Sequence, residues 1–236
     1  MTIIVGLVTE TFVALVADRR LTYADEIIVD DNRSKSVIWC GKAAWGYTGL
    51  AEIDGTPTNQ WLVRTLGVEA EPAAKLRDEA TAAFSQRWAR RLQPGTRRTA
   101  FLGVTWNFGN LRPVIVTTSN FISASGHIAA EADDSFSMFA EFIPRGQRFH
   151  LKCVGQALDT AAAVELRALM GHRLIAASPE QLPKVHTTEP VTFGALRTGD
   201  EFKQLLRELA PTMDVILFQL SDGTCGAMTI QELLTP

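Results

Sequence analysis

The chain contains few cysteines and histidines, the side chains that most often bind zinc. Cys40, Cys153 and Cys225 are odd in number and lie far apart in the sequence, which favours free, buried thiols in a reducing cytosol. The histidines show no metal-ligand spacing either: His127, His150, His172 and His186. We therefore expect no metal and no cofactor.

Long apolar runs and an excess of one charge are also missing. No stretch approaches the ~20 apolar residues of a membrane span, and no basic segment precedes the apolar N-terminal stretch, as a signal peptide would require. The formal net charge of −3 gives no long-range attraction to nucleic acid or anionic lipid. Five arginines are interpreted as a solvated helix end: Arg87, Arg90, Arg91, Arg97 and Arg98. These features predict a cytoplasmic protein without nucleic-acid or membrane partners.

What is present fits one globular domain. The 236 residues are 46% hydrophobic and 21% charged, and no linker, internal repeat or low-complexity tract divides them. We therefore predict a single domain over residues 1–236.

The first fifty residues are rich in strand patterns. Residues 2–9 and 11–18 are apolar and β-branched around a polar break, which predicts two paired strands. The pattern continues over 26–30 and 35–48, with a turn at Gly41-Lys42.

After these strands, the spacing of apolar residues changes to the period of a helix. Thr56 is interpreted as the cap of a helix with Pro57 at its first position and Gly67 as its stop. A longer helix follows Pro72 and ends before Pro94. Its predicted buried face consists of Leu76, Ala80, Ala83, Phe84 and Trp88.

Strands and helices alternate again in the second half. Strands are expected at 100–106 and 113–117, joined by a hairpin turn, and at 149–154, whereas the polar segment 119–147 has no assigned element. Apolar spacing and a capping box predict helices between Gly155 and Gly171 and from Thr198 onward. The chain closes with strands at 215–220 and 225–230. This order indicates an α+β fold, a four-layer α-β-β-α sandwich of two antiparallel sheets.

The N-terminus carries the clearest chemical signal. Initiator methionines that precede a small residue are generally removed, which would leave Thr2 with its hydroxyl and a free α-amine on one residue. An α-amine has a pKa of roughly 7.7–8.0 in short peptides, so part of it can accept a proton at neutral pH. Thr2 would then combine a nucleophile and its base.

Four anchors in order resemble the β-type subunits of the proteasome and their bacterial relatives, within the N-terminal nucleophile hydrolases. The anchors are Thr2-Ile3-Ile4-Val5-Gly6, Ala17-Asp18-Arg19-Arg20 with Thr22, Lys35, and Tyr47-Thr48-Gly49. The spacing from Thr2 to Asp18 and Arg20 matches the family without a gap, Lys35 follows with one extra residue in the loop, and Gly49 stands fourteen residues beyond it.

The resemblance implies a role for each anchor. Thr2 Oγ would attack the substrate carbonyl, and its α-amine would take the proton and return it to the leaving amine. The Lys35 ammonium would depress the pKa values of the Thr2 hydroxyl and amine, and Asp18 would hold Lys35 charged and aimed. The Gly49 N–H would stabilise the oxyanion, because a glycine allows close approach.

The family also implies a threonine-type peptidase or amidase. Its subunits would form a ring of identical copies around a chamber, act on peptide or protein substrates, and work with or without an unfolding ATPase. Gly155-Gln156-Ala157 departs from the family's Gly-Ser-Gly, and Glu208 and Thr212 lie only loosely where the family has an aspartate and a serine. The alternative is a non-catalytic ring or scaffold subunit.

Each anchor also has a plain structural interpretation. Thr2 would be an ordinary threonine at the start of a strand, and Asp18 and Arg20 would form a surface ion pair. Lys35 would be a solvated lysine on an edge strand, and Gly49 would be a turn glycine. Trp45 and Tyr47 would line a substrate pocket or, more simply, belong to the core.

Overall fold

The computed structural model describes residues 3–10, 12–17, 21–22, 28–30, 33–39, 43–67, 71–107, 112–155, 216–220 and 225–228. Its strands are β1 (Ile3–Thr9), β2 (Phe12–Ala17), β3 (Leu21–Thr22), β4 (Ile28–Asp30), β5 (Ser36–Trp39), β6 (Ala43–Thr48), β7 (Glu52–Ile53), β8 (Thr56–Pro57), β9 (Ala100–Asn107), β10 (Arg112–Ser119), β11 (Ser137–Phe142), β12 (Phe149–Gly155), β13 (Ile216–Leu220) and β14 (Cys225–Met228). Its helices are α1 (Thr58–Leu66), α2 (Pro72–Phe84) and the short 3₁₀ helix η1 (Ala89–Arg91).

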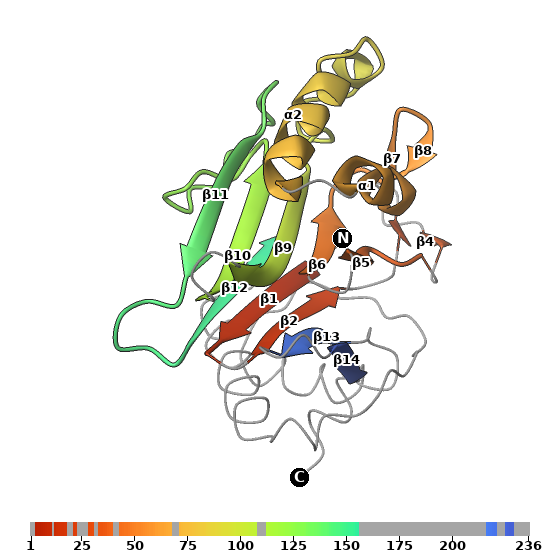
Figure 1. Ribbon diagram of the computed structural model, residues 1–236. Helices are drawn as coiled ribbons and strands as arrows, with labels where there is room; N and C mark the ends of the chain where they lie inside the picture. Colours follow the sequence, from red (N-terminus) through yellow and green to blue (C-terminus); the bar gives the residue numbers. More distant parts are fainter. Residues whose placement is uncertain are drawn as a thin grey trace.

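Two five-stranded antiparallel sheets form the centre of the fold (Figure 1). The first sheet has the order β12-β1-β2-β13-β14 and the second has the order β11-β10-β9-β6-β5. The strand pairs predicted at the N-terminus, around 107–110 and at the C-terminus are therefore confirmed. The turns of the last two pairs lie outside the described residues.

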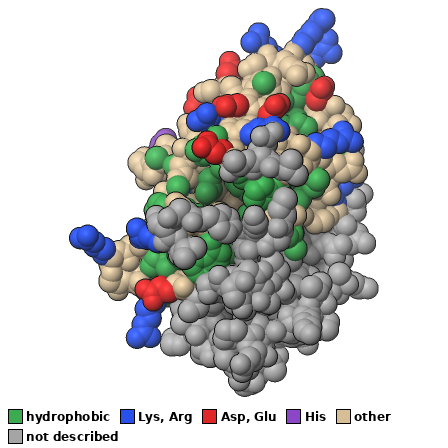
Figure 2. Space-filling model, viewed as in Figure 1, with side chains coloured by type: hydrophobic (Ala, Val, Ile, Leu, Met, Phe, Trp, Pro, Cys, Tyr) green, Lys and Arg blue, Asp and Glu red, His purple; other side chains and the backbone are tan. Residues whose placement is uncertain are grey.

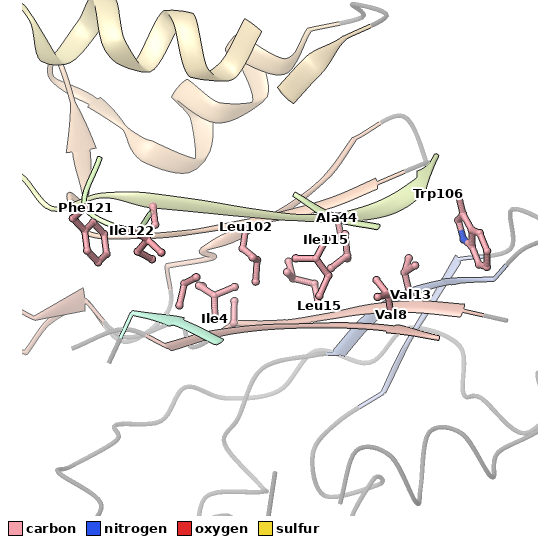
Figure 3. Close-up of a cluster of buried hydrophobic side chains, with 14 residues drawn as sticks. Ile4, Val8, Val13, Leu15, Ala44, Leu102, Trp106, Ile115, Phe121 and Ile122 are labelled. Atoms are coloured by element: carbon pink, nitrogen blue, oxygen red, sulfur yellow. The ribbon is translucent and has the colours of Figure 1, made fainter. Parts of the chain in front are cut away.

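The two sheets pack face to face because their strands alternate. In the register of β1 with β2, Ile4 pairs with Ala17 and Val8 with Val13, which places all four side chains on one face. These residues are buried in a cluster with Leu102 and other apolar residues of the second sheet, as Figure 3 shows. Burial of each large side chain in such a cluster contributes roughly 1.5–3 kcal/mol.

Helices α1 and α2 cover the other face of the second sheet (Figure 1). The predicted α2 stripe is largely confirmed, since Leu76, Ala80 and Phe84 are fully buried against this sheet. The helix ends at Phe84, earlier than the sequence predicted, and η1 follows it. Trp88 still packs against the same cluster from beyond the helix.

The start of α1 differs from the prediction. Thr56 lies in β8, paired with Ile53, and Pro57 occupies the N-cap position without a side-chain cap. The tertiary pairing of β7 with β8 thus overrides the local capping signal. Gly67 does end the helix, with a φ of 51°.

The described residues supply three layers, namely one helical layer and the two sheets. The helices expected between Gly155 and Gly171 and after Thr198 lie outside the described residues, so the fourth layer and the single domain over 1–236 remain predictions. Among the described residues, no helix has the length and apolar character needed to cross a membrane.

A polar contact joins the outer strands of the two sheets. Glu141 of β11 lies 3.1 Å from the Lys152 Nζ and 3.6 Å from the His150 Nε2, both on β12. Partial burial pushes the pKa of Glu141 up, but His150 and Lys152 outweigh burial and hold the pKa below its ordinary value. The folded state therefore favours the Glu141 carboxylate.

Replacing this carboxylate should make the protein less stable in a pH-dependent way. We expect Glu141→Gln to lower the free energy of unfolding by about 1–2 kcal/mol at pH 7, because Lys152 loses its charged partner. A group with a lowered folded-state pKa stabilises above its ordinary value, here 4.5, so the difference should vanish as the pH falls below that value. Denaturant unfolding at pH 7 and pH 3 measures this difference. The exposed Glu131→Gln is the control, and equal stabilities of wild type and Glu141→Gln at pH 7 would contradict the assignment.

Candidate functional site

Lys35 and Gly49 lie at the same end of the second sheet. Strands β5 and β6 are antiparallel, with Ser36 opposite Gly46, so the residue before β5 and the residue after β6 meet at one end. The Tyr47 N–H donates to the Lys35 carbonyl at 3.1 Å, which extends the pairing to Lys35. The hairpin itself therefore brings these two predicted site residues together.

In the first sheet, β1 starts and β2 ends at this same end of the sandwich. A Cβ on Gly46 would lie 2.8 Å from the Ile4 Cγ2, so Ile4 packs directly on β6. Figure 3 shows Ile4 toward Phe121 and Ile122, whereas Val8 lies toward Trp106 at the opposite end. The start of β1, and with it the end of β2 at Ala17, thus lies at the end of the sandwich where β6 stops.

Thr2 and Asp18 lie outside the described residues, as do Arg20, Gln156, Glu208 and Thr212. Their described neighbours are well defined by pairing. Ile3, which follows Thr2, pairs with Gly155, and Ala17, which precedes Asp18, pairs with Ile4. The described residues next to these two positions, Ile3 and Ala17, therefore lie at the end of the sandwich that carries Lys35 and Gly49.

Lys35 is buried, with 1% of its surface exposed. The interpretation of Lys35 as a solvated lysine on an edge strand is therefore wrong. Lysine is almost never fully buried unless it is paired, because removing an ammonium from water is costly. Its burial just before the start of β5 makes Lys35 a candidate site residue.

Gly49 has a conformation that other residues rarely adopt. Its φ is 107°, and a Cβ there would lie 2.3 Å from the Arg98 carbonyl oxygen and 2.6 Å from the Thr99 Oγ1. Amides two residues apart along an extended strand point to the same side. Because the Tyr47 N–H points to Lys35, we expect the Gly49 N–H to point to the side of β5 as well. Gly49 is exposed, which leaves its amide near solvent on the Lys35 side.

Buried and partly buried hydrogen bonds hold the turn that follows Gly49. The Thr58 Oγ1 donates to the Leu50 carbonyl at 2.7 Å, which ties the turn to α1. On the other side, the Leu50 N–H lies 3.5 Å from the Thr99 Oγ1, and the Thr99 N–H donates to the Asn120 Oδ1 at 2.9 Å. Sequence reasoning missed these supports, because Thr99 and Asn120 are distant in sequence and match no motif.

Trp45 and Tyr47 belong to the core and do not line a pocket. Each is 1% exposed, and both pack in the cluster between the second sheet and the helices. The simpler of the two interpretations is therefore confirmed. The same alternation points Gly46, between them, toward the first sheet.

The five arginines divide into two groups. Arg87, Arg90 and Arg91 are exposed, as predicted for a solvated helix end. On the face seen in Figure 2, Lys and Arg side chains are interspersed with Asp and Glu side chains. Arg97 and Arg98 depart from the prediction, because Arg97 is buried and Arg98 is half-buried.

Different partners hold these two arginines. The Arg97 Nη2 lies 2.6 Å from the Asp134 Oδ1, and this hydrogen-bonded guanidinium lowers the pKa of Asp134. The Arg98 guanidinium lies over the Phe121 ring, 4.4 Å from its centroid. Within the described part of the chain, no cluster of acidic, histidine or cysteine side chains could hold a metal ion.

The chain has a limited structural similarity to a known protein. The crystal structure of eukaryotic HslV from Trypanosoma brucei is similar with a TM-score of 0.45 at 13% sequence identity, over 92% of this chain and 98% of that chain. No family model matches the sequence. No curated protein matches it either.

The Gly49 geometry predicts an unusually costly substitution. We expect Gly49→Ala to lower the free energy of unfolding by more than about 3 kcal/mol, because the new Cβ meets backbone atoms in addition to the strain of a positive φ. Gly55 is a matched control with a φ of 70° and no atom within 4 Å of the position that a Cβ would occupy, so Gly55→Ala should cost only about 1–2 kcal/mol. Chemical denaturation of both variants measures the difference, and equal costs would show that the turn at Gly49 is not tightly packed.

Proposed function

We propose that the chain is an N-terminal nucleophile hydrolase that cleaves amide bonds with Thr2. The observation that supports this proposal best is the convergence of four strand ends at one end of the sandwich. These are the start of β1, the end of β2, the start of β5 and the end of β6. Each adjoins one of the four anchors that the sequence singled out.

Chain connectivity limits how far Thr2 can be from the other anchors. Two peptide units separate Thr2 from Ile4, a span of at most about 7.6 Å between Cα atoms. Ile4 packs on Gly46, whose cross-strand partner Ser36 adjoins Lys35. Asp18 likewise follows directly on Ala17, the partner of Ile4.

The reaction then proceeds by acyl transfer. The Thr2 Oγ attacks the substrate carbonyl carbon while its proton passes to the Thr2 α-amine, directly or through a water. The C–N bond breaks as that proton moves to the leaving amine, and water hydrolyses the resulting ester to regenerate Thr2.

The remaining anchors support this chemistry electrostatically. The buried Lys35 ammonium favours the uncharged form of the nearby α-amine and the developing alkoxide of Thr2. Asp18 keeps Lys35 charged and oriented. The Gly49 N–H donates to the oxyanion, an interaction that contributes roughly 2.7–4 kcal/mol in comparable sites.

The natural substrate class in this proposal is a peptide or an unfolded protein, and the working form is a ring of identical subunits. The apolar residues of α2 do not argue for assembly, because the chain's own sheet already buries them. On the described helices, Val63 of α1 is the large apolar side chain left exposed, at 54%. Ring formation therefore stays a prediction from the resemblance.

The nucleophile is tested by a pair of substitutions. Thr2→Ala should abolish hydrolysis of amide reporter peptides, because no hydroxyl remains to attack, whereas Thr2→Ser should retain measurable activity. N-terminal sequencing of the same preparations should show residue 2 as the first residue. Unchanged turnover by Thr2→Ala, or a wild-type chain that still begins with Met1, would contradict the mechanism, and a retained Met1 would favour the non-catalytic alternative.

The role of Lys35 predicts a change in the pH profile. In Lys35→Met the Thr2 amine loses the neighbouring positive charge, so it should hold its proton to higher pH and the acidic limb of kcat should move upward. We also expect kcat to fall by about 100-fold or more near neutral pH. Lys75→Met, on α2, is the control and should leave both unchanged. An unaltered pH profile in folded Lys35→Met would remove Lys35 from the mechanism.

A further inference from the structure

The end of the second sheet carries a row of residues next to the proposed site. The strand order β10-β9-β6-β5 places Phe121, Arg98, Gly49 and Lys35 just beyond successive strand ends. Neighbouring strands lie about 4.8 Å apart, so Arg98 and Lys35 flank Gly49 on opposite sides. The short distance from the position of a Cβ on Gly49 to the Arg98 carbonyl confirms that these two backbones are adjacent.

The Arg98 side chain lies on the side that faces the first sheet. Ala100, the first residue of β9, belongs to the cluster between the sheets. The Arg98 guanidinium is seated on Phe121, which belongs to that same cluster. The cation therefore lies at the mouth of the space between the sheets, at the end where β1 begins.

This cation lacks the partner that its neighbour has. Arg97 is neutralised by Asp134, whereas no described carboxylate forms an ion pair with Arg98. The Arg98 Nε is buried and donates to no acceptor among the described residues. The Arg97 Nε is equally without an acceptor there, so the two arginines differ in the carboxylate partner that Arg97 has in Asp134. Because a charge withdrawn from water is normally paired, the guanidinium of half-buried Arg98, unpaired within the described part of the chain, calls for an anionic ligand.

The chemistry of the guanidinium identifies that ligand. A guanidinium that stacks on an aromatic ring keeps its N–H groups in one plane, which matches the two oxygens of a carboxylate. We propose that Arg98 binds a carboxylate of the substrate, carried within one or two residues of the amide bond presented to Gly49. This inference rests on the proposed function and names its substrate class as peptides with a negative charge beside the cleaved bond.

Three reporter peptides distinguish the sources of the carboxylate. One carries glutamate beside the scissile bond and an amidated C-terminus, the second carries glutamine and a free C-terminal carboxylate, and the third carries glutamine and an amidated C-terminus. Wild-type protein should show a kcat/KM about 10- to 100-fold higher for the first or the second peptide than for the third, as expected for a charge-assisted hydrogen bond. The peptide that is preferred identifies the source.

Substitutions of Arg98, and of a second arginine as control, test whether Arg98 binds the carboxylate. Arg98→Met keeps the apolar stem but removes the charge, so the preference ratio should fall to about one, and Arg98→Lys should keep only part of it. Arg112 is a matched control, because its guanidinium lies 4.9 Å from the Phe142 ring centroid at the opposite end of β10. Arg112→Met should retain the full preference. A wild type without preference, or a preference that survives in Arg98→Met, would overturn the proposal.

Binding separates this inference from the proposed catalysis. Equilibrium affinities of the three peptides for the Thr2→Ala chain, which cannot turn them over, should show the same order and lose it when Arg98→Met is added. If wild-type protein hydrolyses none of the peptides, the proposed function fails, while the affinities still support or overturn carboxylate recognition by Arg98. Equal affinities with active hydrolysis would overturn the Arg98 inference alone.

Discussion

The packing of Ile4 on Gly46 joins the two sheets at the end where the predicted site residues Lys35 and Gly49 lie. Position 46 has no room for a side chain, since a Cβ there would lie 2.8 Å from the Ile4 Cγ2. Within each sheet the register is fixed by pairing, and a slip of one residue would turn every inward side chain outward. Together with the apolar cluster between the sheets, this contact brings the start of β1 and the end of β2 to the end of the sandwich that carries Lys35 and Gly49.

The charges around this end have different environments, and the differences suit different tasks. Lys35 is a compact ammonium that is withdrawn from water, which suits the control of proton positions. Arg98 is a planar guanidinium on an aromatic ring with an unsatisfied Nε, which suits recognition of a carboxylate. Arg97 has a partner in Asp134 and belongs to the framework. Gly49 lies between Lys35 and Arg98, so a carbonyl that reacts beside Gly49 would have a cation on either side.

Runs of apolar and β-branched residues were sufficient to predict the long strands, because strands such as β6 and β9 are buried on both faces. The pattern failed for β11, whose residues are mostly exposed or half-buried, and for the start of α1, where β7 and β8 pair in place of a cap. Lys35 and Gly49 could be paired from the sequence, since one hairpin connects them. Arg98, Thr99 and Asn120 could not, because their approach to Gly49 depends on the strand order β10-β9-β6, to which no local signal points.

The most direct test of the account is to find which atom of the protein reacts with an electrophile that captures nucleophilic hydroxyls as esters. Purified wild-type chain is incubated with a peptide that bears such a group, and tandem mass spectrometry then locates the adduct. The account predicts one adduct per chain, on residue 2 as the first residue. An adduct confined to any other residue, or none on a chain whose N-terminus is free, would contradict it.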